Sequence, residues 1–178
     1  MAKLLIVSDN HFQAKPLVDI ISHHHDADYF IHCGDSQWLP DDMRLQNFTI
    51  VKGNNDFVKM PNDVLLEIAG YKILVAHGHQ QYVYNDGADN MNGTAELVTY
   101  AQGNFAADIV LYGHTHVPET HLDRGINVLN PGSTNYPRSF TKRFPTYAIM
   151  ILSPEEITIN FFHAQTHEDL TNEIRSSK

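Results

Sequence analysis

The sequence predicts an α/β fold, a layered sandwich in which mixed central sheets are covered by helices. Three observations lead to this prediction. Short apolar runs rich in β-branched residues recur along the 178 residues, helical patterns lie between some of the early runs, and the late part consists mostly of runs. Continuous apolar runs of this kind are typical of strands that are buried on both faces.

The first part of the chain alternates between expected strands and an expected helix. Strands are expected at residues 4–7, 29–32 and 49–51. Between the first two, Pro16 is expected in the first turn of a helix whose apolar face includes Leu17, Ile20 and Ile21. His23, His24 and His25 then close this helix at a solvated end, where the helix dipole favours imidazolium.

The remainder of the chain is expected to contain mainly strands. Residues 64–68 and 73–75 flank Gly70-Tyr71, which predicts a hairpin turn. Residues 94–100 begin like a helix that Thr94 caps. Four further strands are expected at residues 109–112, 126–129, 147–152 and 157–162.

Composition indicates an ordinary globular chain. Hydrophobic residues make up 42% and charged residues 19%, and no repeat or linker divides the sequence, so we expect one domain over residues 1–178. The apolar run at residues 4–7 is too short for a signal peptide or a membrane span, which predicts a cytoplasmic protein that does not enter a membrane. Cys33 is the one cysteine, which excludes an internal disulfide and a multi-cysteine zinc site. We expect it to be a small buried residue and not a nucleophile.

Polar side chains follow six of the apolar runs, at the point where each expected strand ends. Ligands of α/β proteins bind just beyond the carboxyl ends of strands, so these side chains converge if the ends share one side. Glycines in the same turns let the backbone bend sharply. The residues concerned are Asp9 and His11, Asp35, Asn54 and Asn55, His77 and His79, His114 and His116, and finally the segment 130–133.

The chemistry of this set predicts a site for divalent transition metals. Carboxylates, a carboxamide and imidazoles suit Mn²⁺, Fe, Zn²⁺ or Ni²⁺ better than Ca²⁺, which prefers oxygen ligands alone. Two neighbouring cations need a bridging carboxylate, for which Asp35 is the natural candidate. Such a pair activates a hydroxide, clamps phosphate oxygens and offsets the charge of an in-line displacement.

The order Asp-x-His, Gly-Asp, Gly-Asn-x-Asp, His-Gly-His and Gly-His-Thr-His resembles the calcineurin-like metallophosphoesterases. The forms Gly-Asn-Asn-Asp and Asn-Pro-Gly-Ser resemble the small bacterial and archaeal phosphodiesterase branch of that family. The resemblance implies a four-layer α/β/β/α sandwich and hydrolysis of a small phosphate ester by a metal-activated hydroxide, often with Mn²⁺. It also implies that Asp9, His11 and His116 bind a first metal, that Asp35 bridges, and that Asn54, His77 and His114 bind a second.

One position departs from the pattern of this family. Many members carry a histidine after the ligand asparagine, which assists phosphate binding or departure of the leaving group, whereas this chain has Asn55. An amide donates a hydrogen bond to phosphate but cannot act as a general acid. The proton for the leaving group therefore comes from water, from another residue such as His79, or not at all. Arg138 is either a second contact to the substrate phosphate or a surface residue.

Competing interpretations remain at this stage. Taken alone, Asp9 and Asp35 are explained equally well as caps, His77 and His79 as surface loop residues, and Asn54 as a turn residue. The His114-x-His116 pair argues against a purely structural role, and the ordered set favours a metal site. The resemblance also extends to a eukaryotic retromer subunit, which implies a non-catalytic metal-binding scaffold as the alternative function. A nuclease is a third interpretation, but the net charge of −9 and the lack of a basic stretch argue against a nucleic-acid polymer as substrate. Pairing with a second copy is also open.

Overall fold

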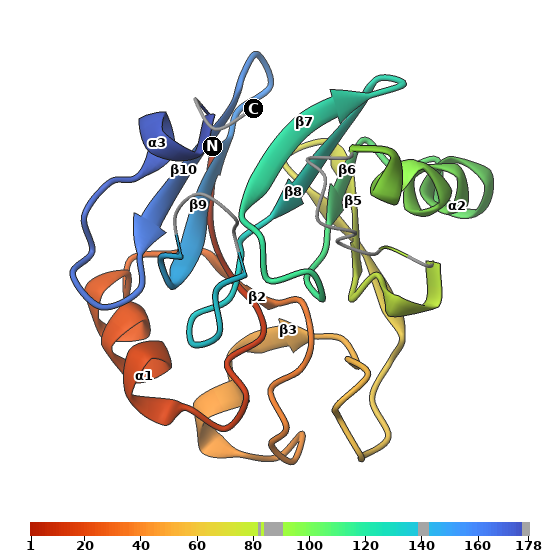
Figure 1. Ribbon diagram of the computed structural model, residues 1–178. Coiled ribbons are helices and arrows are strands. Elements are labelled where there is room, and N and C mark those ends of the chain that lie inside the picture. The colour runs from red at the N-terminus through yellow and green to blue at the C-terminus, as the bar shows by residue number, and fades with distance from the viewer. Residues whose placement is uncertain (82, 84–90, 139–142, 176–178) are drawn as a thin grey trace.

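Two mixed five-stranded sheets form the centre of the computed structural model, which describes residues 1–81, 83, 91–138 and 143–175. The strand orders are β10-β9-β1-β2-β3 and β4-β5-β6-β8-β7 (Figure 1). The strands are β1 (Ala2–Val7), β2 (Tyr29–His32), β3 (Phe48–Ile50), β4 (Asp63–Ile68), β5 (Tyr71–Ala76), β6 (Ile109–Leu111), β7 (Glu119–Asp123), β8 (Ile126–Asn130), β9 (Thr146–Leu152) and β10 (Ile157–His163). The helices are α1 (Ala14–His23), α2 (Ala95–Phe105), α3 (Thr171–Arg175) and the 3₁₀ turns η1 (Met43–Leu45), η2 (His79–Gln81) and η3 (Met91–Thr94).

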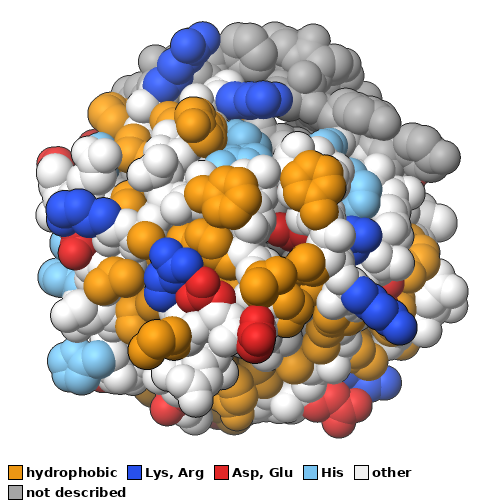
Figure 2. All heavy atoms as spheres, turned by 90° about the horizontal axis from the view of Figure 1, so that it is seen from below, with side chains coloured by type: hydrophobic (Ala, Val, Ile, Leu, Met, Phe, Trp, Pro, Cys, Tyr) orange, Lys and Arg blue, Asp and Glu red, His pale blue; other side chains and the backbone are white. Residues whose placement is uncertain are grey.

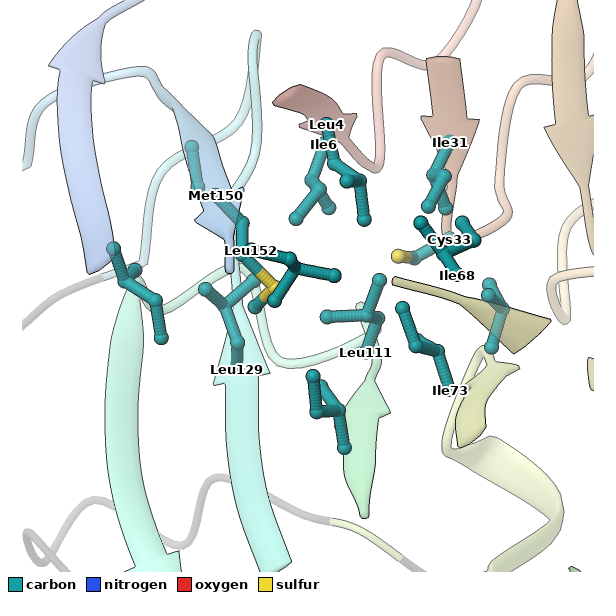
Figure 3. Close-up of a cluster of buried hydrophobic side chains, with 14 of the residues drawn as sticks. Leu4, Ile6, Ile31, Cys33, Ile68, Ile73, Leu111, Leu129, Met150 and Leu152 are labelled. Carbon is teal, nitrogen blue, oxygen red and sulfur yellow. The ribbon is translucent and has the colours of Figure 1, made fainter. Parts of the chain in front are cut away.

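The alternation of side chains along β1 shows how the first two layers form. Leu4 and Ile6 point into the core between the sheets, where they join Ile31 of β2 (Figure 3). Leu5 and Val7 point to the other face and pack against α1. Because both faces of the strand are buried, its sequence is one continuous apolar run.

The second sheet is built in the same way. Ile73 and Leu111 face the first sheet across the shared core, while Leu74 and Val110 face Leu97 of α2. The layers are therefore α1, first sheet, second sheet and α2, which confirms the predicted α/β/β/α sandwich (Figure 1). Within the described residues, none of the helices has the length and apolar character needed to span a bilayer.

Parallel pairing gathers the ends of six strands. β2 pairs parallel with both β1 and β3 in the first sheet. In the second sheet, β6 pairs parallel with both β5 and β8. The loops that follow these strands carry the polar residues of the predicted site, and contacts between them join the two sheets, as the predicted convergence requires.

Local predictions about helix ends and turns needed three corrections. The hairpin turn consists of Ala69 and Gly70, both at positive φ, because Ile68 pairs with Tyr71. Thr94 precedes α2 but makes no capping hydrogen bond; its hydroxyl lies 3.1 Å from His121 Nε2. The helix end at residues 23–25 is not wholly solvated, since His24 is 8% exposed and lies 2.8 Å from the Tyr147 hydroxyl.

Candidate metal centre

Five of the seven predicted metal ligands lie in loops where the backbone adopts positive φ. This conformation is costly for residues with a side chain and persists only where surrounding contacts hold it, which occurs often at functional sites. Such contacts are present, because the Asp9 amide donates to Gly34 O at 3.0 Å and the His11 amide donates to Asp35 O at 3.2 Å. The residues and their φ angles are Asp9 (53°), His11 (44°), Asp35 (57°), His114 (68°) and His116 (61°).

Two glycines allow these loops to approach each other closely. A Cβ on Gly53 would overlap the carboxylate of Asp35, and a Cβ on Gly113 would overlap Ser8 Oγ and lie 2.7 Å from Asp9 Oδ2. Both carboxylates therefore lie directly against a neighbouring backbone. A side chain at either glycine would displace a predicted ligand.

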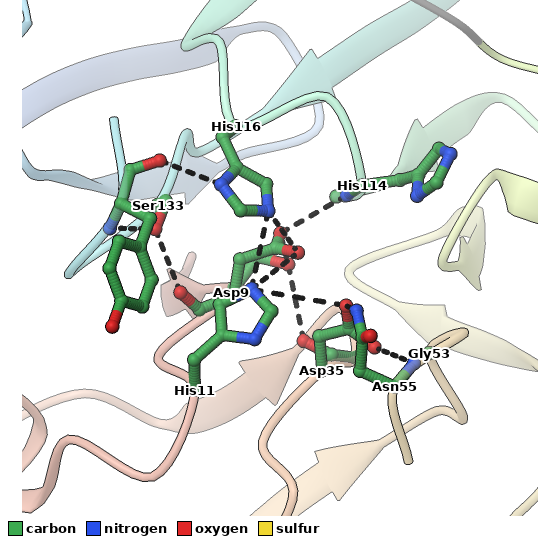
Figure 4. Close-up of polar contacts among 12 residues, drawn as sticks. Asp9, His11, Asp35, Gly53, Asn55, His114, His116 and Ser133 are labelled. Atoms are coloured by element: carbon green, nitrogen blue, oxygen red, sulfur yellow. Dashed lines mark hydrogen bonds and ion pairs between the residues drawn. The ribbon is translucent and has the colours of Figure 1, made fainter. Parts of the chain in front are cut away.

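His11 and His116 turn the same nitrogen toward the centre. His116 Nδ1 lies 2.6 Å from the Tyr136 carbonyl, and His11 Nδ1 lies 3.1 Å from Gln37 Oε1. Because both partners are acceptors, each Nδ1 carries the hydrogen and each Nε2 of the neutral ring presents a lone pair. The two Nε2 atoms are 3.3 Å apart beside Asp9 (Figure 4). A divalent cation is the kind of group that such opposed lone pairs attract.

His77 repeats this arrangement on the other side of Asp9. Its Nδ1 donates to the Cys33 carbonyl at 2.7 Å, which leaves the Nε2 lone pair directed inward. That Nε2 lies 3.1 Å from Asn54 Oδ1, 3.6 Å from Asp35 Oδ2 and 4.0 Å from Asp9 Oδ1. All three oxygens are acceptors, so none of them supplies a hydrogen to the ring.

The carboxylate of Asp9 is fully buried at the centre of the cluster. Its Oδ2 accepts from Ser8 Oγ at 2.5 Å and from the His114 amide at 3.1 Å. Its Oδ1 has no hydrogen-bond partner among the described residues, although His116 Nε2 lies 3.1 Å away. Burial by itself would raise the pKa of Asp9. The neighbouring His116, His77 and Ser8 outweigh burial and lower the pKa below its usual value, so the carboxylate stays ionised.

The donor atoms fall into two groups that share Asp9. In each group one ligand atom from every residue lies within 4.8 Å of the others. A divalent cation among these atoms would satisfy Asp9 Oδ1 and the inward lone pairs of the three imidazoles together. The residues therefore fit a divalent metal with oxygen and nitrogen ligands. The groups are Asp9, His11 and His116, and Asp9, Asp35 and His77.

Asp35 belongs to the second group and also lies near His11 of the first, and Asn55 holds its carboxylate there. Asp35 Oδ2 is 3.9 Å from His11 Nε2 and 3.6 Å from His77 Nε2. The amide of Asn55 donates to Asp35 Oδ1 at 2.7 Å, and its side-chain Nδ2 donates to Oδ2 at 2.5 Å. Asn55 thus orients Asp35 in addition to lining the pocket.

The remaining predicted residues lie at the edge of the cluster. The His114 imidazole is directed away from Asp9 (Figure 4) and toward His77, with ring centroids 5.2 Å apart. Burial lowers the pKa of His114 to about 4. His79 lies 5.3 Å from His77 between ring centroids, and its pKa is lowered, chiefly by burial. Arg138 is exposed and lines the pocket, whereas His79 is not among the described residues that line it.

Asp56 and His32 support the site, although the sequence had given them no role. Asp56 is 3% exposed and accepts the backbone amides of Asp35 (2.9 Å), Gly53 (2.8 Å) and Gln37 (2.6 Å). It thereby ties the loop after β2 to the loop after β3. His32 is fully buried, accepts from the Gly34 amide at 3.2 Å and donates to Asn10 Oδ1 at 2.9 Å, and burial lowers its pKa to about 4.

Ser133 and Tyr136 connect the loop after β8 to the same cluster. Ser133 Oγ donates to the Asp9 carbonyl at 2.7 Å and accepts from the Tyr136 amide at 2.7 Å. The Tyr136 ring lies edge-on to the His11 ring, with centroids 5.4 Å apart. The available signal was the Asn-Pro-Gly-Ser segment before Tyr136, which predicts a turn but not its partners.

An open pocket of about 540 Å³ lies over the cluster. One wall consists of predicted metal ligands together with Asn55, and the segment 135–138 forms another part of the lining. Figure 2 shows the corresponding face of the molecule, where histidine side chains are visible between hydrophobic side chains. The volume suits a small molecule.

Comparison with known proteins shows the family to which the chain belongs. The model of the calcineurin-like phosphoesterase superfamily domain matches residues 2–155. A probable metallophosphoesterase of Bacillus subtilis, YsnB, is 35% identical over 175 residues, which cover 96% of this chain and 98% of the relative. A probable metallophosphoesterase of Methanocaldococcus jannaschii is 33% identical over 160 residues, covering 85% of this chain and 75% of the relative.

Solved structures show the same fold. A predicted phosphoesterase of Streptococcus pneumoniae superposes with a TM-score of 0.82 at 30% identity, covering 94% of this chain and 92% of that one. A novel archaeal phosphodiesterase superposes with a TM-score of 0.64 at 24% identity, covering 88% of this chain and 98% of that one. Vps29 of Entamoeba histolytica, solved with Zn²⁺, superposes with a TM-score of 0.72 at 22% identity, covering 94% of this chain and 95% of that one.

Proposed function

Because the chain belongs to the calcineurin-like phosphoesterase superfamily, we propose that it is a metal-dependent phosphodiesterase that hydrolyses a small phosphate ester. One observation carries the proposal: the inward lone pairs of His11, His77 and His116 surround the buried carboxylate of Asp9. The name of the Bacillus subtilis relative and the archaeal phosphodiesterase among the structural neighbours support it.

The proposed site holds two divalent ions, Mn²⁺ first among Mn²⁺, Fe, Ni²⁺ and Zn²⁺. When bound, such a pair activates water and neutralises charge on the phosphate oxygens. Asp35 would help to hold both ions, since its Oδ2 lies 3.9 Å from His11 Nε2 and 3.6 Å from His77 Nε2. The other proposed ligands are Asp9, His11 and His116 for one ion, and Asn54, His77 and His114 for the other.

Asn55 and Arg138 are the proposed contacts to the substrate phosphate, because both line the pocket and both donate hydrogen bonds. Neither supplies a proton to a leaving group, since an amide is not an acid and a guanidinium stays protonated. We propose water as the proton source and not His79, which the described pocket lining does not include. Esters with acidic leaving groups are therefore the preferred substrates.

Hydrolysis of bis-p-nitrophenyl phosphate tests this function. The protein should hydrolyse this diester with added Mn²⁺ and lose the activity in EDTA. Asp35→Asn should abolish turnover, while Asp41→Asn, at an exposed position, should leave turnover unchanged. An Asp35→Asn variant with normal turnover would refute the role of the bridging carboxylate.

Assays with further substrates distinguish the proposed function from the two alternatives. Tight metal binding without hydrolysis across mono- and diesters would favour a non-catalytic scaffold, the alternative raised by the resemblance to a retromer subunit. Cleavage of single-stranded DNA at moderate salt would favour a nuclease, which the net charge of −9 opposes. The cytoplasmic location and the single domain stay predictions of the sequence, and pairing with a second copy stays an open alternative.

A further inference from the structure

Three exposed aromatic side chains lie next to the loops of the metal centre. Phe12 is 58% exposed and follows His11 directly, Phe57 is 88% exposed and follows Asp56, and Tyr136 is 55% exposed. Of the three, only Tyr136 is among the described residues that line the pocket.

The backbone of Tyr136 is fixed to the metal centre on both sides. Its amide donates to Ser133 Oγ at 2.7 Å, and Ser133 in turn bonds to the Asp9 carbonyl. Its own carbonyl accepts from His116 Nδ1 at 2.6 Å. Because this backbone is already fixed, a ligand that packs on the ring does not have to order the loop as well.

The ring itself is left largely open. It contacts the His11 ring edge-on, with 5.4 Å between the two ring centroids. Two residues further along, Arg138 lines the same pocket, and its amide donates to the His116 carbonyl at 3.2 Å. A phosphate near Arg138 and the metal ligands would thus have a rigid aromatic surface beside it.

We propose that Tyr136 is a stacking platform for a planar aromatic group on the ester, and that the substrate is a small aryl or nucleoside phosphodiester. The inference rests on the proposed function and narrows its substrate class. Stacking on an aromatic ring requires only a π-face and is worth a substantial factor in affinity per base. The acidic chain and the pocket volume of about 540 Å³ favour a short ester and not a polymer.

Binding of phosphonates tests the platform without relying on turnover. Calorimetry on the Mn²⁺-loaded protein compares methylphosphonate with phenylphosphonate, which carry the same phosphonate group on a stable carbon–phosphorus bond, and adds thymidine 5′-monophosphate. Phenylphosphonate and the nucleotide should bind more tightly than methylphosphonate. Tyr136→Leu should weaken both by about 10-fold and leave methylphosphonate within about 2-fold, whereas Tyr136→Phe should retain the preference.

Phe57→Ala is the matched control, because Phe57 is an exposed aromatic residue outside the described pocket lining. It should change none of the affinities. Equal weakening of all three ligands by Tyr136→Leu, or the same selective loss in Phe57→Ala, would overturn the assignment. If only the nucleotide loses affinity, the aromatic group is a nucleobase; if phenylphosphonate loses as much, any aryl group is accepted.

Kinetics distinguishes this inference from the proposed function. With bis-p-nitrophenyl phosphate, which is aryl on both sides, Tyr136→Leu should raise KM by about 10-fold at nearly constant kcat. A fall in kcat at constant KM would contradict a stacking role. No hydrolysis by the unaltered protein would sink the proposed function, while the phosphonate comparison would still decide the platform.

Discussion

The Nε2 atoms of His11 and His116 face each other at 3.3 Å, although the opposite nitrogen of each ring already has an acceptor as partner. Two neutral imidazoles oriented in this way cannot hydrogen-bond to each other. The contact becomes favourable when a cation lies between them, so the outer partners of the rings are expected to control metal binding.

Gln37 is the outer partner of His11, and its removal tests this control. Gln37→Met keeps an unbranched side chain but removes the acceptor of His11 Nδ1. The ring is then free to rotate or change tautomer, and we expect metal affinity or activity to fall by about 10- to 100-fold. Calorimetric titration with Mn²⁺ measures the change. Gln46→Met, on the exposed surface, is the control, and equal affinities of the two variants would count against the account.

Asp56 connects two ligand loops through three backbone amides. Asp56→Asn replaces one accepting oxygen by a donor that faces these amides. Buried groups left unsatisfied cost about 1–3 kcal/mol, so unfolding by urea should show a loss of this size. Activity should fall as well, because Asp35 and Asn54 lie on the connected loops. The exposed variant Asp41→Asn should match the unaltered protein; a stable and fully active Asp56→Asn protein would show that the connection is dispensable.

Substitution of glycine by alanine should have opposite outcomes at Gly113 and at Gly103. Gly113→Ala places a methyl group against Ser8 and Asp9, so the variant should lose metal binding. Gly103 lies in α2 with no atom near an added Cβ, so Gly103→Ala should stabilise the fold by about 0.5–1 kcal/mol with unchanged activity. Thermal unfolding and Mn²⁺ titration measure both effects. Metal binding by Gly113→Ala at normal affinity would mean that the loops are not closely packed.

His24 makes stability depend on pH at the far end of α1. Burial, followed by the charge of Lys3, lowers the pKa of His24 from 6.5 to about 4. The unfolded chain therefore binds a proton between pH 6.5 and 4 that the folded chain does not, and stability falls as the pH drops through this window. One such group contributes a slope of up to about 1.4 kcal/mol per pH unit.

The variant His24→Gln isolates this contribution, since glutamine can still bond to the Tyr147 hydroxyl but does not titrate. Urea unfolding in EDTA at pH 7.5, 6 and 5 should give a smaller loss of stability for His24→Gln than for the unaltered protein. His25→Gln, at an exposed position, should retain the full slope. Parallel pH profiles for His24→Gln and the unaltered protein would contradict the burial effect.

The sequence predicts this fold well wherever strands are buried on both faces. Residues 4–7 and 109–112 form continuous apolar runs because a helix covers one face of each strand and the opposite sheet covers the other. β7 (Glu119–Asp123) was not predicted, because it is an edge strand of mostly polar residues that pairs only with β8 among the described strands. An edge strand of this kind has no apolar run to reveal it.

The sequence was enough to predict which residues supply metal-ligand atoms. It was not enough to predict which residues hold their loops in place. Asp9 and Asp35 follow apolar runs, so their meeting at the strand ends follows from the parallel pairing of β1 with β2. Asp56 and Tyr136 act through contacts to loops that are distant in sequence. Local patterns hold no information about such contacts, so the roles of these residues appear only in three dimensions.

Titration of metal against activity tests the central claim most directly. Protein treated with EDTA and then desalted receives Mn²⁺ in steps, while bound ions per chain are counted by mass spectrometry and hydrolysis of bis-p-nitrophenyl phosphate is measured. We predict two bound ions per chain and activity that rises with their binding. Full activity before any Mn²⁺ is added, or two bound ions without hydrolysis of this or any other ester, would contradict the account.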